Sequence, residues 1–183
     1  MKVSETMHER MLISTDRLTI GEFDESMIQS VHKNSLDEDN RRFVPDEVFE
    51  TMEVAAEVVE WLMGAYEGDE GPFVYPVLLR NGENIGYVQA VPLGDEWEIG
   101  YHIAKAHAGS GYATEAVSAF LPEMMERLAI DHIWGITLAE NVASHRVLEK
   151  CGFVLEDAGI AAYQGHERDV RKYLYRDTRC FDR

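Results

Sequence analysis

The sequence predicts a mixed α/β (α+β) fold in which a central sheet of about six to seven strands is flanked by helices. Three observations indicate this fold. Strand-like runs around an Asn-Gly turn form a meander over residues 73–103. Amphipathic helices then alternate with further strands over residues 112–175. A meander followed by a βαβαβ order gives one mixed sheet with helices on its faces.

Length and composition fit a single globular domain over residues 1–183. Apolar residues make up 45% of the chain and charged residues 28%. No run approaches the roughly 18 apolar residues of a membrane span, and the polar start lacks the apolar core of a signal peptide. The two cysteines, Cys151 and Cys180, form neither a disulfide framework nor a zinc motif. We therefore expect a cytoplasmic protein with no metal and no membrane partner.

The strongly acidic charge limits the choice of partners. The formal net charge is −17, and such a surface repels phosphate backbones, so nucleic acid is not expected as a partner. Many of the acidic residues precede residue 61. A charge run of this kind is typical of solvated helix surface, but it would also attract a cationic ligand.

The N-terminal third predicts one strand and two helices. Leu18 lies in a first strand over about residues 12–23. A helix begins near Glu25. A second helix begins near Thr51, whose hydroxyl can cap it, and an apolar stripe runs along this helix until Gly64 breaks the pattern.

The middle of the chain predicts three antiparallel strands. They cover residues 73–79, 85–91 and 97–103. Asn81-Gly82 joins the first two and is a strong hairpin signal. Because side chains alternate along a strand, Glu98 and His102 share the face opposite Trp97.

The C-terminal half alternates helices with strands. A helix runs from Tyr112 to about Ala129, although Pro122 within it deletes one backbone hydrogen bond. A strand over 132–138, a helix over 141–150 and strands over 153–155 and 170–175 follow. Gly152 stands where a helix end favours a left-handed residue. Residues 159–168 fit either an ordered hairpin or a mobile lid.

A loop with two glycines precedes the helix at Tyr112 and indicates an anion site. The first amide groups of a helix lack partners and carry positive partial charge, and glycine allows an anion to approach the backbone. Gly109-Ser110-Gly111 is thus a candidate phosphate or pyrophosphate loop, although many such pairs are only flexible turns. Thr114 stands where a dinucleotide fingerprint needs Gly or Ala, and the P-loop pattern is absent as well.

Three segments, in this order, resemble the GNAT acetyltransferases, in particular the RimJ/RimL-like branch that acetylates N-terminal amines and small amines. The segments are EIGY at 98–101, GSGYATEA at 109–116 and NVASHRVLEKCGF at 141–153, and TDRL at 15–18 resembles the opening strand of that family. The resemblance spans most of the chain. It implies a mostly antiparallel sheet with splayed central strands. It also implies an acetyl-CoA-dependent N-acetyltransferase that acts on a primary amine.

The resemblance further implies which residues hold acetyl-CoA. The strand edge at Ile103 would pair with the pantetheine amides, and Asn141 and Ser144 would reach the pantetheine arm or the sulfur. The pyrophosphate would bind backbone amides of the loop made by His107, Ala108, Gly109, Ser110, Gly111, Tyr112 and Ala113. The positions before the first glycine lack the long polar side chains usual in this family. The backbone amides must therefore do more of the binding.

Acetyl transfer to an amine needs a base for the amine proton and a proton source for the leaving thiolate. Glu98 is the candidate base, although a carboxylate that only orders water fits the same position. Ser144 is the candidate for protonating or positioning the thiolate, or it only satisfies the helix start. Asn141 can cap its helix, bind the coenzyme or do both, and His102 is either a proton relay or structural. Direct transfer in a ternary complex is favoured over an acetylated Cys151, since such cysteines are commonly inert.

Two functions remain open from the sequence. One is this acetyltransferase, with either a protein N-terminus or a small-molecule amine as acceptor. The other is a non-catalytic module that binds or senses acyl-CoA. The acidic N-terminal region favours a cationic acceptor, whereas Arg41-Arg42 could select an acceptor that bears a carboxylate or phosphate. Whether the chain forms a homodimer is also open.

Overall fold

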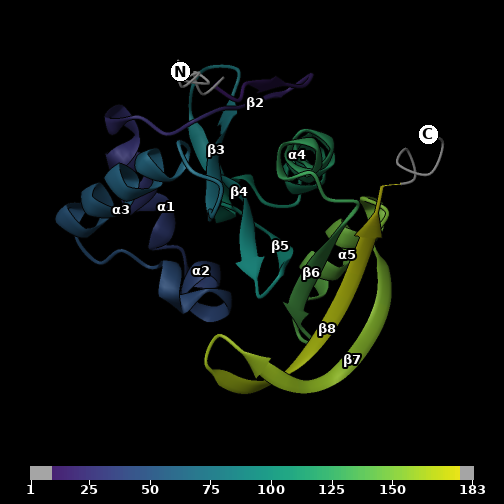
Figure 1. Ribbon diagram of the computed structural model, residues 1–183. Coiled ribbons are helices and arrows are strands. Elements are labelled where there is room, and N and C mark those ends of the chain that lie inside the picture. The colour runs from purple at the N-terminus through teal and green to yellow at the C-terminus, as the bar shows by residue number, and fades with distance from the viewer. Residues whose placement is uncertain (1–9, 178–183) are drawn as a thin grey trace, which may run out of the picture.

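A single sheet of eight strands organises the computed structural model, which describes residues 10–177 (Figure 1). Its order is β1-β2-β3-β4-β5-β6-β8-β7. The strands are β1 (Ile13–Ser14), β2 (Leu18–Ile20), β3 (Phe73–Leu79), β4 (Asn84–Leu93), β5 (Glu96–Ile103), β6 (His132–Leu138), β7 (Val154–Tyr163) and β8 (His166–Arg176). All neighbours pair antiparallel except β5 and β6. The predicted mixed, mostly antiparallel sheet is confirmed.

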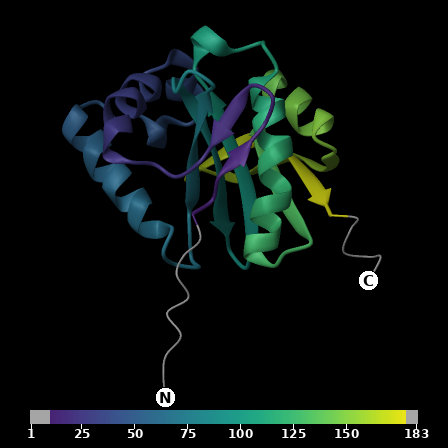
Figure 2. The same cartoon turned by 90° about the horizontal axis from the view of Figure 1, so that it is seen from above.

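Helices cover both faces of the sheet. They are α1 (Ile28–Ser35), α2 (Glu38–Phe43), α3 (Met52–Ala65), α4 (Tyr112–Leu128) and α5 (Val142–Lys150), with short 3-10 turns η1 (Glu25–Met27), η2 (Pro45–Glu47) and η3 (Lys105–His107). Helices α1 and α3 lie on one side, and α4 and α5 lie on the other (Figures 1 and 2). No helix within residues 10–177 combines the length and apolar character that crossing a bilayer requires.

The N-terminal strand differs from the prediction. One strand was expected over about residues 12–23, but the structure has a two-stranded hairpin, β1 and β2. The hydroxyl of Thr15 accepts the amide of Leu18 at 2.9 Å, and the carbonyl of Leu18 accepts the amide of Thr15 at 3.0 Å. This tight turn divides the single strand that was expected into β1 and β2. The sheet therefore has eight strands.

Helix α2 and η2 were not predicted. The six residues of α2 contain a single apolar side chain, Phe43, so no helical stripe marks the segment. The polar segment 38–47 lies beside β4 and β5, and the site described below depends on it.

The central strands β5 and β6 diverge. They pair at one position, Glu98 with Trp134, whereas β4 pairs with β5 along the whole of β5. Beyond Glu98 the two strands separate towards Ile103 and Leu138. This separation is the expected splay, and it leaves an edge of β5 open in the middle of the sheet.

Residues 159–168, which the sequence left open, form part of an ordered β-hairpin. Tyr163 pairs with His166, and the two turn residues, Gln164 and Gly165, have φ angles of +51° and +76°. Two positive φ angles are typical of the type I′ turn that joins twisted strands. The Gln164 side chain donates to the carbonyl of Phe43 at 3.2 Å, which connects the hairpin tip to α2.

Gly86 permits the close approach of β4 to β5 at the wide end of the splay, near Ile103. It pairs with Ile103 and has a φ of +154°, and a Cβ atom at this position would overlap the carbonyl oxygen of His102. In contrast, a Cβ atom at Gly64 of α3 would have no heavy atom within 4 Å.

We expect Gly86→Ala to lower the free energy of unfolding by at least about 2 kcal/mol, because backbone has to move. The matched variant Gly64→Ala should be neutral or stabilise α3 by roughly 0.5–1 kcal/mol. Urea denaturation of both variants measures the difference. Equal stability of the two would contradict this account of Gly86.

Candidate active site

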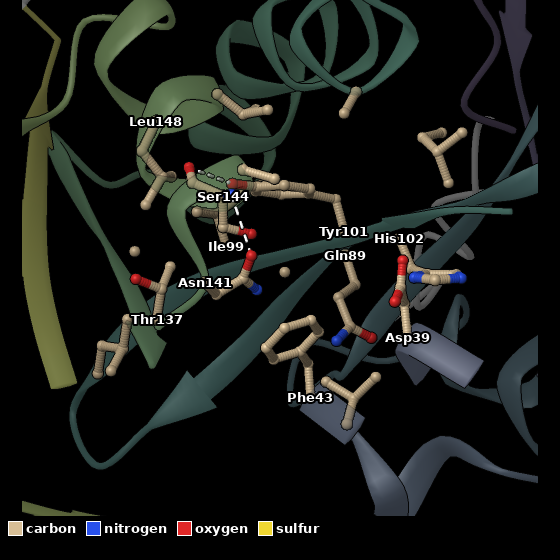
Figure 3. A pocket seen from close by; sticks show the side chains of 18 of the residues that line it. Asp39, Phe43, Gln89, Ile99, Tyr101, His102, Thr137, Asn141, Ser144 and Leu148 are labelled. Atoms are coloured by element: carbon tan, nitrogen blue, oxygen red, sulfur yellow. Dashed lines mark hydrogen bonds between the residues drawn. The ribbon is translucent and has the colours of Figure 1, made fainter. Parts of the chain in front are cut away.

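A cleft of about 780 Å³ opens where β5 and β6 diverge. This volume lies within the usual range of ligand sites. Figure 3 shows Thr137, Asn141 and Ser144 along one wall and Asp39 and His102 along the other. We call the first the α5 wall, after its helix. We call the second the acidic wall, since it includes acidic residues of the polar segment 38–47.

Nearly all residues predicted for the site come together in this cleft. Its lining includes Glu98, Ile103, His107, Ala108, Gly109, Gly111, Tyr112, Ala113, Asn141 and Ser144. The exception is Ser110, which is exposed and does not line the cleft. Its carbonyl accepts a hydrogen bond from Arg17 at 2.8 Å. Ser110 therefore ties the loop to the N-terminal turn.

The loop before α4 has a backbone suited to an anion. Gly109 and Gly111 have φ angles of +76° and +81°, so both use the left-handed conformation that glycine allows. The side chains of Thr51 and Asn141 cap α3 and α5, but no side chain caps α4. Since the first turn of α4 lines the cleft, its amide groups face the open space with their positive partial charge.

The N-terminal turn holds this loop in place. The guanidinium of Arg17 lies 4.4 Å from the centre of the Tyr112 ring. Glu115 accepts hydrogen bonds from Arg17 Nε and from the Thr15 hydroxyl, both at 2.6 Å. Burial opposes ionisation of Glu115, but these hydrogen bonds hold its pKa below the ordinary value. No local pattern predicts this contact, because its partners are about a hundred residues apart.

Two cationic side chains of α5 that the sequence analysis did not single out line the cleft. Arg146 and Lys150 lie four residues apart and therefore on one side of the helix. Neither forms an ion pair within residues 10–177. His107, in contrast, is engaged, because its Nε2 lies 3.1 Å from the carboxylate of Glu83. Within residues 10–177, the Lys and Arg side chains that line the cleft without an ion pair thus lie on α5 and not in the loop.

The first turn of α5 presents polar groups to the cleft. Asn141 Oδ1 accepts the amide of Ser144 at 3.2 Å, so Asn141 caps the helix as predicted. Tyr101 Oη donates to the carbonyl of Ser144 at 3.1 Å, which fixes this turn against β5. Capping uses only the oxygen of the Asn141 amide. The nitrogen of that amide is thus available to a ligand, and the two roles considered for Asn141 are compatible.

Two carboxylates with raised pKa values line the same cleft. Burial raises the pKa of Glu98 to about 7, against a hydrogen bond from the backbone of Ile136, and the charge of Glu47 raises it further. Burial also raises the pKa of Glu47, although Tyr87 and Gln89 donate hydrogen bonds to it, the latter at 3.0 Å. A carboxylate with a pKa near 7 fits a general base. The sequence identified Glu98 but not Glu47, because η2 is too short to show a pattern.

Buried polar atoms without partners also line the cleft. Within residues 10–177, Thr137 Oγ1 and His102 Nε2 lack a hydrogen bond. His102 Nε2 is 3.5 Å from Asp37 Oδ2, and burial lowers the pKa of this imidazole despite that neighbour. His102 Nε2 therefore has a weak partner in Asp37, whereas Thr137 Oγ1 has none in the described chain. A buried hydroxyl of this kind is rare in folded proteins and is usually satisfied by a ligand or water.

Cys151 is separate from this chemistry. It does not line the cleft, and its Sγ lies 3.4 Å from the hydroxyl of Ser118. Burial raises the pKa of the thiol, which disfavours the nucleophilic thiolate. Cys180 lies outside the described residues. Among residues 10–177, no group of His, Cys, Asp and Glu side chains is arranged to hold a metal ion.

Comparison with known proteins gives consistent matches. The family described as "Acetyltransferase (GNAT) domain" matches residues 17–154. The chain is 30% identical over 145 residues to "Uncharacterized N-acetyltransferase YnaD" of Bacillus subtilis, covering 78% of this chain and 82% of that protein. The acetyltransferase (GNAT family) of Bacillus anthracis superposes with a TM-score of 0.78 at 26% identity, covering 91% and 99% of the two chains.

A further solved structure is RimL, a ribosomal L7/L12 alpha-N-protein acetyltransferase, in complex with coenzyme A. It superposes with a TM-score of 0.78 at 20% identity, over 91% of this chain and 98% of RimL. At this identity the likeness shows a shared fold.

We expect Glu98→Gln to stabilise the protein at about pH 8 relative to pH 4.5. The folded-state pKa of about 7 lies above the ordinary 4.5, so the stability linked to the protonated carboxyl is present below pH 4.5 and is lost as the pH rises through 7. The variant should therefore gain about 3 kcal/mol over the wild type across this range.

Urea denaturation at a series of pH values measures this gain. Glu96→Gln is a suitable control on the same strand, because the hydrogen bond from His132 lowers the pKa of Glu96 and no such gain is expected. A constant difference between wild type and Glu98→Gln would show that the pKa of Glu98 is not raised.

Proposed function

This chain belongs to the GNAT acetyltransferase family, and we propose that it transfers the acetyl group of acetyl-CoA to a cationic primary amine. One observation carries the proposal. A single cleft is lined both by the uncapped start of α4 and by Glu98, a half-buried carboxylate with a pKa of about 7. The first suits a pyrophosphate and the second suits the removal of a proton from an amine.

The residues that would hold the coenzyme are distributed along the cleft. The amides of residues 108–113 receive the pyrophosphate, and Arg146 and Lys150 supply positive charge beside it. The open edge of β5 near Ile103 pairs with the pantetheine amides in the manner of an added strand. Asn141 offers its amide nitrogen to the same arm. Ser144 would lie next to the sulfur atom at the end of that arm.

The transfer is direct. Glu98, when ionised, first takes a proton from the bound ammonium and passes it to solvent, because only a neutral amine nitrogen can attack. That nitrogen forms a bond to the acetyl carbon while the bond from that carbon to sulfur breaks. Glu98 accepts the second proton that the nitrogen loses, and the Ser144 hydroxyl donates a proton to the leaving thiolate and regains one from solvent. Because Cys151 lies outside the cleft, this route needs no acetylated cysteine.

The charges around the acidic wall support a cationic acceptor. Asp39, Asp46 and Glu47 line the cleft together with Glu98. The two arginines that could have selected an anionic acceptor are both paired. Arg41 forms two hydrogen bonds with Glu50 at 2.5 and 2.9 Å, and Arg42 contacts Glu140 at 3.0 Å. The acceptor end of the cleft therefore carries uncompensated negative charge, which favours an ammonium group.

Thiol release from acetyl-CoA with a panel of primary amines tests the proposal. We expect kcat/KM to rise with pH and to level off above about pH 7, because the base acts only when Glu98 is ionised. Glu98→Gln should lose at least about 100-fold in turnover and also lose this inflection, while Glu96→Gln keeps both. Coenzyme binding without transfer to any amine would instead favour the non-catalytic, acyl-CoA-sensing module.

The double variant Arg146→Ala/Lys150→Ala should raise the Kd of coenzyme A about tenfold at low salt, because two charges facing the phosphates are removed. The effect should shrink at about 0.5 M salt, where exposed charges are screened. Titration calorimetry measures both constants. Lys33→Ala/Arg168→Ala removes the same charge from exposed positions outside the cleft and should leave Kd unchanged. Equal Kd values for the two double variants would refute the role of α5.

A further inference from the structure

A second, smaller cavity of about 330 Å³ lies among α1, α3, β3 and β4. Most of its lining side chains are apolar. They include Phe23, Val31, Phe49, Val58, Trp61 and Leu62. Trp61 is 58% exposed, which is unusual for so large an apolar side chain and places it at the rim. The cavity thus has an apolar interior and an aromatic edge open to solvent.

The smaller cavity adjoins the main cleft, and the two spaces share part of their lining. Six residues line both spaces, namely Asp46, Glu47, Tyr87, Gln89, Val91 and His102. The Glu47 carboxylate therefore stands at the junction, held by its hydrogen bonds from Tyr87 and Gln89. A group bound in the smaller cavity would extend its polar end past Glu47 towards Glu98.

An unused hydrogen-bond acceptor lies at this junction. Asn40 lines the smaller cavity and is 1% exposed. Its Nδ2 donates to the carbonyls of Ser35 at 3.1 Å and Glu47 at 2.8 Å, so the orientation of the amide is fixed. Its Oδ1 has no partner within the described chain. A buried oxygen of this kind is stabilised by a ligand or water that supplies an N–H or O–H donor.

We propose that the acceptor is a primary amine carried on an apolar group of aromatic size, with the apolar group in the smaller cavity and the ammonium at the junction near Asn40 and Glu47. This inference rests on the proposed function, since it assigns the substrate class of the same site. A second ammonium, as in a polyamine, would lose its hydration against the apolar side chains Phe23, Val58 and Leu62, which carry no charge to compensate it. The same chemistry is present in a free arylalkylamine and in the N-terminal residue of a peptide that begins with an aromatic side chain.

Acceptor selectivity of the full chain tests the proposal. The amines are phenethylamine, ethylamine and putrescine, and the peptides are tetrapeptides that begin with phenylalanine or with serine. We expect kcat/KM for phenethylamine, or for the phenylalanine peptide, to exceed that of its non-aromatic counterparts by at least about 30-fold. The stronger of the two aromatic acceptors identifies the source. Equal or better use of putrescine, ethylamine or the serine peptide would overturn the proposal.

Two variants on one face of α3 localise the effect. Val58→Phe fills the smaller cavity and should lower the ratio of kcat/KM for phenethylamine to that for ethylamine at least about tenfold. Val54→Phe, one turn away, is 41% exposed, lines neither cavity and should leave the ratio unchanged. Trp61→Ala, at an exposed site, should raise KM for phenethylamine and provides a second test should Val58→Phe fold poorly.

The outcomes separate this inference from the proposed function. Thiol release with ethylamine or putrescine, but no aromatic preference and no effect of Val58→Phe or Trp61→Ala, overturns the inference alone. An absence of transfer to every amine and peptide, with coenzyme A still bound, overturns both.

Discussion

The separation of β5 from β6 is the constraint on which the rest of this structure depends. A continuous ladder between these strands would leave no room for a ligand and would pair the edge of β5 with protein. A single pair, Glu98 with Trp134, keeps the sheet intact and opens the space beyond it. Everything else in the site is arranged around that opening, with α4 and α5 on one side and the polar segment 38–47 on the other.

The separation of β5 from β6 also places side chains of opposite charge on the two walls of the cleft. The α5 wall carries Arg146 and Lys150, which form no ion pair within the described chain. Across the cleft lie the half-buried carboxylates of Glu47 and Glu98, whose pKa values are raised by burial. In the proposed function, a polyanionic coenzyme and a cationic acceptor would meet complementary charges from opposite sides of one cleft. This arrangement would allow a chain with a net charge of −17 to bind the phosphates of the proposed coenzyme.

Local sequence signals predicted those parts of the site that depend on local structure. Gly109 and Gly111 indicated a left-handed loop, and Asn141 indicated a helix cap, because each uses backbone groups within a few residues. Glu47 and Asn40 lie in short polar segments without periodicity. Glu47 contacts a strand about 40 residues away, and the amide of Asn40 binds the carbonyls of Ser35 and Glu47, which no helical or strand pattern relates to it. Arg17 contacts a helix about a hundred residues later. No pattern in one sequence shows such pairings, and they are set by tertiary packing alone.

The hydrogen bonds of Thr15 and Arg17 with Glu115 make the geometry of the loop before α4 depend on the first hairpin. Closing so long a loop costs entropy and comes late in folding relative to local contacts. A molecule whose first hairpin has detached would keep most of its sheet yet lose the support behind Ser110 and Tyr112. Affinity for a phosphate would then depend on whether the first hairpin is docked against α4. A molecule would bind its ligand only after this long-range contact has formed.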